Sequence, residues 1–354
     1  MPAKVTSISD QFVAVAAESA YGTAATAFTR VLPATDDSWT PEIQEVDTGA
    51  FRPNRQAMTA DQTVQVPTGG TGTVTVNVAA SGLFLMWRDL LDSFTAALGS
   101  VADSSLKRLS LRTDSVGPTA TSARSLSFLV GRVDVNQARR ETVYAGCVPT
   151  GWTLEASPGA PVTLAVEYDY ASEADRTPSS SGSYAAPALS SVTDGPFYTW
   201  RDVAVSIGGT TLPTVTGLTV TADRALDTDR RYLDGDATKS VPIRGTGLPA
   251  YTVSVDAHLD STTAALLANW GVDGTTGEIV VTLTGREDLK TGGSTPRYTS
   301  VTVTFAEAKI IGTQPVASLD GLTTVTVECQ VVDPYTQSGV AGQIEVVSAQ
   351  SAIN

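Results

Sequence analysis

The segment "PVTLAVEYDY" at residues 161–170 returns in similar form as "LTTVTVECQV" at residues 322–331. Glu167 reappears as Glu328, and the other matching positions keep the same offset of 161 residues. In the first segment, apolar residues alternate with Thr, Glu and Asp, which is typical of a strand with one buried face. A strand that recurs at a constant offset indicates that the chain contains two copies of one unit.

Further blocks recur in the same order, and together they extend this repeat over most of the chain. They are "EVDTGAFR" (45–52) with "ALDTDRRY" (225–232), "TVTVNVAASGLFLMWRDLL" (73–91) with "TVSVDAHLDSTTAALLANW" (252–270), "SLSFLVGR" (125–132) with "IVVTLTGR" (279–286), and "YAGCVPTGWTLEASPGAPVTLAVEYDY" (144–170) with "FAEAKIIGTQPVASLDGLTTVTVECQV" (305–331). We therefore predict two copies of one domain, at 1–175 and 196–354. Residues 176–195, rich in Ser, Pro and Gly, are predicted to link them.

Each copy is predicted to be mainly β, with one helix beside a β-sandwich or barrel. In the first copy, Ser81 can cap a helix whose apolar side runs to Phe94 and which Gly99 can end. Asp260 or Ser261 can cap the helix of the second copy. The first copy also carries a polar insertion at about 99–123 without clear periodicity, for which we predict a long loop.

Charge and composition weigh against nucleic-acid binding and against catalysis. The net charge is −14, whereas binding of nucleic-acid phosphates needs clustered Lys and Arg. His258 is the single histidine, and a catalytic triad or a zinc site needs more partners than one His can supply. The glycines of "TGGTGT" (68–73) lack the Lys-Ser/Thr ending of a phosphate loop. We predict no catalytic, cofactor or metal site and no enzyme activity.

Two further absences in the sequence bear on where the protein acts. Cys147 and Cys329 lie in strand-like settings, and we expect two buried thiols rather than a disulfide. The N-terminal residues show no apolar signal segment, and the longest apolar runs fall far below the about 18 residues of a membrane span. We therefore expect no membrane contact by this chain.

Several blocks resemble a known family. They are "ESAYGTAATAFTRVLPATDDS" (18–38), "VDTGAFRPNRQ" (46–56) and the two gap-free blocks at 144–170 and 305–331. In their order and general sequence character these blocks resemble the major tail tube proteins of long-tailed (siphovirus-type) bacteriophages, over nearly the whole chain. The resemblance implies tube domains that assemble into stacked rings, and a hollow tail through which genomic DNA is ejected.

The same resemblance implies partners and a location. The partners are other copies of the chain, together with the tape measure, tail terminator and distal tail proteins, while double-stranded DNA passes without specific binding. The protein is then made in the host cytoplasm and resides in the virion tail. The usual ring presents six tube domains, so two domains per chain predict a trimeric, pseudo-hexameric ring. The alternative is a hexameric ring whose second copies decorate the outside.

Two sets of residues are candidates for this role. Polar positions on matched strands are predicted to face the lumen, although they could equally face solvent outside: Asn77, Glu167, Asp256 and Glu328. The polar segments 36–66 and 223–246, largely without strand or helix pattern, are predicted to be loops or hairpins that reach a neighbouring ring or subunit. Their candidate contact residues are Phe51, Arg52, Arg55, Asp227, Arg230, Arg231, Tyr232 and Arg244.

Other functions stay open at this point. A tandem immunoglobulin-like binding or decoration module also has two β domains, but plain immunoglobulin sandwiches lack the repeated helix. An acidic β-rich hydrolase would use the surface carboxylates, for which the sequence offers no positive sign. A contractile injection tube is a variant of the tail-tube hypothesis that the sequence does not separate.

Overall fold

The structure is a computed structural model that describes residues 11–28, 30–47, 63–88, 90–91, 93–94, 99–100, 107–112, 125–133, 139–176, 196–229, 239–244, 247–271, 276–286, 298–316, 323–332 and 341–348. The chain is mainly β, as predicted: 19 of the described strands belong to one connected sheet, and every strand pair in it is antiparallel. Two long strands, β9 and β19, pass between the layers of this sheet.

The first half of the chain pairs its strands in the order β1-β8-β9-β10-β4-β3. Their bounds are β1 (Phe12–Ala17), β3 (Ala34–Asp47), β4 (Thr63–Asn77), β8 (Leu126–Val133), β9 (Arg139–Ala156) and β10 (Thr163–Tyr170). Two short strands add to the edges, β2 (Arg30–Val31) beside β1 and β11 (Ser172–Asp175) beside β9.

The second half pairs its strands in the matching order β12-β18-β19-β20-β17-β14. Their bounds are β12 (Val203–Ile207), β14 (Val215–Asp223), β17 (Ala250–His258), β18 (Gly277–Thr284), β19 (Ser300–Val316) and β20 (Thr324–Val331). β13 (Thr210–Thr211) pairs with β12, and β21 (Gly342–Ser348) occupies beside β19 the place that β11 has beside β9.

The register of the strand pairs repeats together with most of its irregularities. In the β9–β10 pair, Thr150 is the extra residue of a bulge opposite the Glu167–Tyr168 step. In the β19–β20 pair the extra residue is Ile311, which is 161 positions later, as the sequence offset requires. A second bulge places Thr35 in β3 and Thr216 in β14 at matching positions. Bulges bend and twist a strand, so the two halves share local distortions as well as topology.

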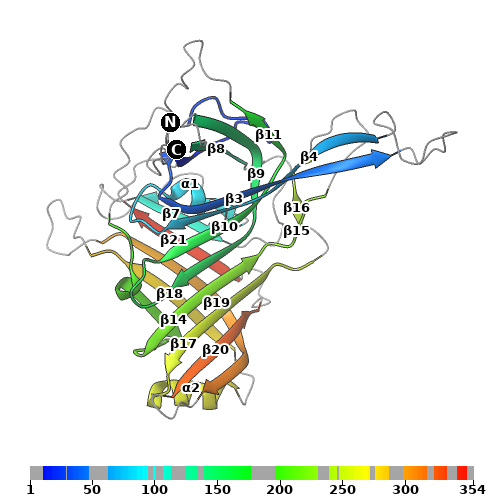
Figure 1. The fold of residues 1–354 in the computed structure, drawn as a ribbon. Coiled ribbons are helices and arrows are strands. Elements are labelled where there is room, and N and C mark those ends of the chain that lie inside the picture. The colour runs from blue at the N-terminus through cyan, green and yellow to red at the C-terminus, as the bar shows by residue number, and fades with distance from the viewer. Residues whose placement is uncertain are drawn as a thin grey trace, which may run out of the picture.

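The two halves join by strand pairing. β14, from the second half, pairs with the C-terminal part of β9, from the first, between Leu218↔Ala156 and Asp223↔Gly151. This pairing creates a continuous run β3-β4-β10-β9-β14-β17-β20-β19, which we call the eight-strand sheet. Figure 1 shows its strands side by side, from the β3–β4 hairpin to β20. β3 and the C-terminal part of β19 form its two edges.

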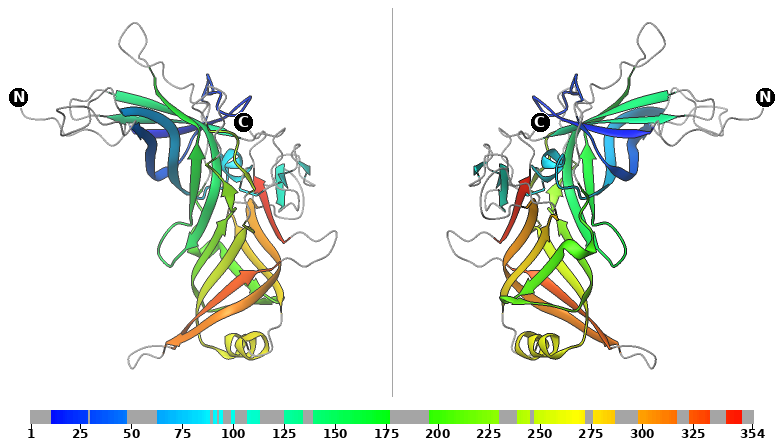
Figure 2. Two further views of the ribbon diagram at one scale, coloured as in Figure 1. Left: turned by 90° about the vertical axis from the view of Figure 1, so that its right-hand side faces the viewer. Right: turned by 90° about the vertical axis from the view of Figure 1, so that its left-hand side faces the viewer.

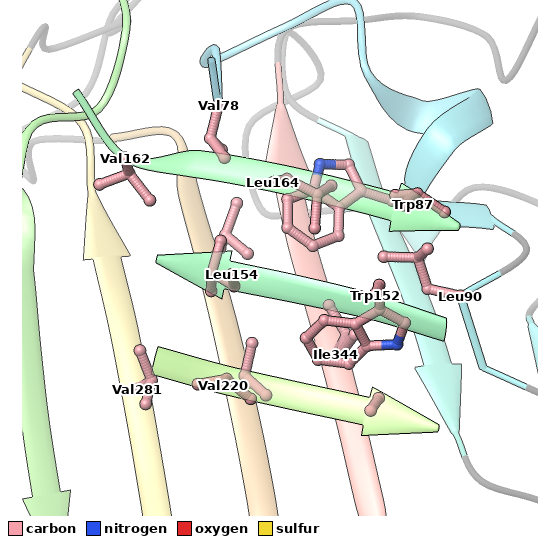
Figure 3. Packing of buried hydrophobic residues seen from close by; sticks show 14 of the residues in the cluster. Val78, Trp87, Leu90, Trp152, Leu154, Val162, Leu164, Val220, Val281 and Ile344 are labelled. Carbon is pink, nitrogen blue, oxygen red and sulfur yellow. The ribbon is translucent and has the colours of Figure 1, made fainter. Parts of the chain in front are cut away.

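One face of the eight-strand sheet packs into the core. Its side chains belong to a single hydrophobic cluster that draws residues from both halves. In Figure 3, Trp152, Leu154 and Val220 from this sheet face the same space as Val281 of β18 and Ile344 of β21, and the strands of the two layers cross steeply. Such crossing layers are joined where long strands bend from one layer into the other, which is the role of β9 and β19.

The first helix is shorter than predicted, whereas the second agrees with the prediction. α1 (Phe84–Arg88) has only five residues, and Phe84 to Trp87 are all buried, so it is an internal turn of helix rather than a half-exposed cover. α2 (Ser261–Gly271) begins as predicted, because the Asp260 carboxylate accepts a hydrogen bond from the Thr263 N–H at 2.7 Å. It lies at the far end of the molecule from β1 and β8 (Figures 1 and 2).

The structure refines two further predictions. The insertion at about 99–123 is not entirely a loop, because β7 (Lys107–Arg112) pairs with β21, beside β5 (Ser93–Phe94) and β6 (Gly99–Ser100). For the segment 36–66 a loop or a hairpin was predicted, and the described residues show the two strands of a hairpin, since β3 continues to Asp47 and pairs with β4. In both places distant pairing partners organise residues whose local pattern is weak.

Candidate functional site

The second face of the eight-strand sheet is polar along its whole width. Alternate residues of all eight strands lie on it, because pairs that are directly opposite in the ladder share a face. They include Asp36, Ser38, Thr40, Thr71, Thr73, Thr75, Asn77, Gly151, Thr153, Glu155, Thr163, Ala165, Glu167, Asp169, Gly217, Thr219, Thr221, Asp223, Thr252, Ser254, Asp256, His258, Lys309, Gly312, Thr324, Thr326, Glu328 and Gln330. We call this surface the polar face.

Acids outnumber basic residues on the polar face, to which Lys309, exposed and opposite Gln330, adds one cation. Six of its carboxylates are exposed: Asp36, Glu155, Glu167, Asp223, Asp256 and Glu328. Thr and Ser fill most of the remaining positions. A surface of this kind repels polyanions and offers them few cations to bind.

All four residues predicted to face a lumen lie on the polar face. Glu167 and Glu328 occupy matching positions, each opposite a glycine in the neighbouring strand. The sequence match of Asn77 with Asp256 is two residues out of register. Asn77 pairs with Thr163 and His258 pairs with Thr324, so His258 is the true counterpart of Asn77.

Glycines make room for three of these acids. A Cβ added at Gly151 would lie 3.2 Å from a carboxylate oxygen of Glu167, and one added at Gly312 would lie 2.9 Å from a carboxylate oxygen of Glu328. Gly217 stands in the same relation to Asp256, at 2.8 Å. The three acidic side chains therefore lie flat across the neighbouring strand instead of projecting from the sheet, which keeps the polar face smooth.

Three acids of the polar face were missed by sequence reasoning. Asp36, Glu155 and Asp223 each take an alternate position in β3, β9 or β14, between residues whose side chains point to the other face. The signal that could have found them was the alternation along β3 and β9. In β3 the Pro41 and the polar composition concealed that pattern.

The junction of the two halves is closed by cations from the second half. The Arg224 N–H donates to the Thr150 carbonyl at 2.9 Å, and its guanidinium Nη1 donates to the Pro149 carbonyl at 2.7 Å. The Lys239 ammonium, buried, contacts carboxylates of Asp169 at 2.9 Å and Glu42 at 2.8 Å. Both cations contact residues in strands of the first half.

The pKa of Lys239 reflects these contacts. Burial alone would lower the pKa of its ammonium, but the hydrogen bonds and charges of Glu42 and Asp169 outweigh burial and hold the pKa above its ordinary value. Lys239 therefore stays protonated throughout the physiological range, and the junction keeps its ion pairs.

The second set of predicted site residues comes from the segments 36–66 and 223–246. Phe51, Arg52, Arg55, Arg230, Arg231 and Tyr232 lie outside the described residues. Asp227 is exposed in β15 (Leu226–Asp227), and the backbone of Arg244 in β16 (Ile243–Arg244) pairs with Leu226. Figure 1 shows the β3–β4 hairpin projecting well beyond the rest of the molecule on the side where β15 and β16 lie.

The described part of the chain offers little for other chemistry. Among its residues there is no group of three or more His, Cys, Asp or Glu placed to hold a metal ion. Cys147 and Cys329 are free and buried, as predicted, and burial raises the pKa of the Cys329 thiol to about 12. No helix within the described ranges is long and apolar enough to cross a bilayer.

Comparison with known families agrees with the resemblance seen in the sequence. Residues 8–331 match the family model described as phage tail tube protein, so the match spans both halves and the junction between them. No curated protein matches the chain.

Proposed function

Because the chain belongs to the phage tail tube protein family, we propose that three copies close into a pseudo-hexameric ring and that stacked rings form the tail tube. The observation that carries this proposal is the β9–β14 pairing, which already joins two matching sets of four strands edge to edge. Repeating that join between chains extends the eight-strand sheet. Three chains then supply six sets of strands, the number expected of a tube ring.

The alternative ring of six chains, with second halves outside, fits the geometry less well. A decorating domain would be attached through a linker or a surface patch, with its own closed sheet. Instead β14, β17, β20 and β19 continue the sheet of the first half without a break, and the two halves share one hydrophobic cluster. This continuity favours a second half that forms part of the tube wall rather than a decoration on its outside.

In such a ring the polar face lines the bore. The apolar face is covered by the second layer of strands and by α1, so the polar face is the one that is left for the lumen. Its carboxylates would repel the phosphates of double-stranded DNA, and its flat-lying Glu167, Asp256 and Glu328 would leave the passage unobstructed. DNA could then slide to the host without sticking during ejection.

The projecting hairpins would connect one ring to the next. The β3–β4 hairpin extends past the eight-strand sheet, and the β15–β16 ladder is its counterpart in the second half. Deleting 46–60 is expected to leave a folded, soluble protein that no longer polymerises, because the deletion spares the part of β3 that pairs with β4 between Asp36 and Glu45. Normal tubes from this variant would argue against the role.

Negative-stain microscopy of the purified protein tests the main proposal. We expect hollow filaments, and end-on averages with six-fold features whose alternate units differ, because the two halves are similar but not identical. Six identical units per ring, each with an outer lobe, would contradict the trimeric ring. Globular particles at every concentration, in the presence of the tape measure protein, would contradict the tube itself.

Charge reversal tests the bore. Glu167→Lys with Glu328→Lys should give tubes that retain short DNA duplexes in pull-down at low salt and release them as salt rises. The matched control is Glu278→Lys, since Glu278 is exposed on β18, in the other layer. Equal DNA retention by the control would show that the polar face does not line the bore.

A further inference from the structure

We infer that the two open edges of the eight-strand sheet pair with each other between chains in one defined register, in which Ile43 of β3 lies opposite Ile311 of β19 in the next copy. This inference rests on the proposed function and specifies its contact. The partner is a second copy of this chain, and the template is the junction that the molecule already contains between β9 and β14.

The register follows from matching positions. β14 corresponds to β3 with an offset of 181, because the bulge residues Thr35 and Thr216 match. β9 corresponds to β19 with an offset of 161. The internal partners Ala222↔Trp152 therefore become Pro41 opposite Thr313 between chains.

The hydrogen-bonded pairs of the internal junction can be identified. The Arg224 N–H donates to the Thr150 carbonyl at 2.9 Å, so this is a hydrogen-bonded pair of the junction. In an antiparallel ladder alternate residues form such pairs, which adds Ala222 with Trp152 and Val220 with Leu154. Between chains, the corresponding pairs are Ile43 with Ile311, Pro41 with Thr313, and Trp39 with Pro315.

Both open edges carry a proline at a position that should donate. Pro41 replaces Ala222, and Pro315 replaces Leu154, so each edge lacks one N–H that would point at the partner. Proline on an edge strand discourages uncontrolled strand addition. The ladder between chains therefore has two hydrogen bonds fewer than the internal one. The open edges are then less prone to pair with a strand of another protein before the ring forms.

An apolar contact takes the place of a charged one. At the internal junction the pair is Arg224, buried, with Thr150. The corresponding residues on the open edges are Ile43, 55% exposed, and Ile311, 56% exposed, two of the large hydrophobic side chains that the isolated chain leaves in water. Directly opposite in the ladder, each would cover the other, which explains why both edges present an isoleucine.

Disulfide trapping tests the register. Opposite residues of a hydrogen-bonded pair have Cα atoms about 5.5 Å apart, within the range that a disulfide spans. Assembled tubes of Ile43→Cys/Ile311→Cys should be cross-linked between chains on mild oxidation, as non-reducing gels would show, with a closed trimer as the limit product. The matched control is Ile43→Cys/Lys309→Cys, two residues out of register on the exposed side of β19.

Pro41→Ala provides a second readout that needs no cysteine. It restores one donor to the edge and should lower the critical concentration for polymerisation about five-fold, the value of one net hydrogen bond. Pro158→Ala, in the exposed turn after β9, should leave that concentration unchanged.

The outcomes separate the inference from the proposed function. If assembled tubes cross-link at the control pair, or do not cross-link at all, the proposed register is wrong, while the proposed tube function is unaffected. If the cysteine variant does not assemble, an unchanged critical concentration for Pro41→Ala overturns the inference. Absence of tubes from the unmutated protein overturns the proposed function instead.

Discussion

The two halves of the molecule keep one hydrogen-bond pattern while many of their side chains differ. The Thr35 hydroxyl donates to the Thr75 carbonyl at 3.3 Å, and the matching Thr216 hydroxyl donates to the Asp256 carbonyl at the same distance. The bulges and the strand order repeat as well. Register is therefore the feature that the duplication has preserved, because a slip by one residue would exchange the apolar and polar faces of a strand.

The differences concentrate at positions that one half buries at the internal junction and the other half leaves on an open edge. Asp169, buried beside Lys239, corresponds to Gln330, which is exposed and uncharged. Arg224, buried at the internal junction, corresponds to the exposed Ile43. Buried charges are costly without their partners. An edge that faces water before assembly can carry neutral residues at these positions without that cost.

The largest effect is expected from removing the buried cation of the internal junction. Lys239→Met leaves the Asp169 carboxylate, whose side chain is 1% exposed, without its ammonium partner. The free energy of unfolding should fall by about 3–5 kcal/mol in urea titration. Glu42→Gln, at a partner that is 50% exposed, is the control and should cost under about 1 kcal/mol.

A second variant checks the reason for that loss. Adding Asp169→Asn to Lys239→Met should recover a substantial part of the stability, because the uncompensated charge disappears. The contribution of the unmutated Lys239 is fully present below its ordinary pKa of 10.5 and is lost as the pH rises through the higher pKa of the folded state. A double variant as unstable as Lys239→Met would show that packing, rather than charge, dominates.

The matching glycines give a smaller effect that should differ between the halves. A Cβ at Gly151 would lie 3.0 Å from the Ala222 carbonyl oxygen, across the internal junction, whereas the contact of a Cβ at Gly312 is with the end of the Glu328 side chain. Gly151→Ala should therefore cost about 1–2 kcal/mol in the isolated chain, and Gly312→Ala distinctly less. Thermal unfolding of both variants provides the measurement.

Gly312→Ala, which the isolated chain should tolerate, should destabilise the assembled tube. If β3 of another copy pairs with β19, its Pro41 carbonyl takes the place that Ala222 holds beside Gly151. Gly312→Ala tubes should dissociate at a lower temperature than unmutated tubes, although the isolated chains are nearly equal in stability. Tubes of unchanged stability would mean that this edge of β19 stays open.

Sequence reasoning succeeded where the repeat was long and free of gaps. The 27-residue block beginning at Tyr144 fixed the offset of 161, and that offset predicts the bulge at Ile311 from the one at Thr150. Alternation within β10 and β20 placed Glu167 and Glu328 on one face. These features depend on local periodicity, because a strand with one buried side has apolar residues at alternate positions.

It failed where a distant partner decides the structure. The match of "SLSFLVGR" (125–132) with residues 279–286 has an offset of 154, but Phe128 pairs with Tyr144 as Ile279 pairs with Phe305, so the offset is 151. Short apolar segments resemble one another at several offsets. β7 likewise depends on β21, more than 200 residues away, and the buried α1 on the layers around it.

The smallest expected effect tests whether matching bulges in the two halves contribute equally to the free energy of unfolding. Thr35→Val and Thr216→Val each remove one hydroxyl that donates to a carbonyl at a bulge, in an exposed setting where water can replace it. Each should lower the free energy of unfolding by about 0.5 kcal/mol, and the two effects should add, since the bulges lie in different strands. Because β14 is already paired on both sides while β3 has one open edge, assembly should amplify the effect of Thr35→Val alone. Equal amplification of both by tube formation would show that β3 gains no new neighbour.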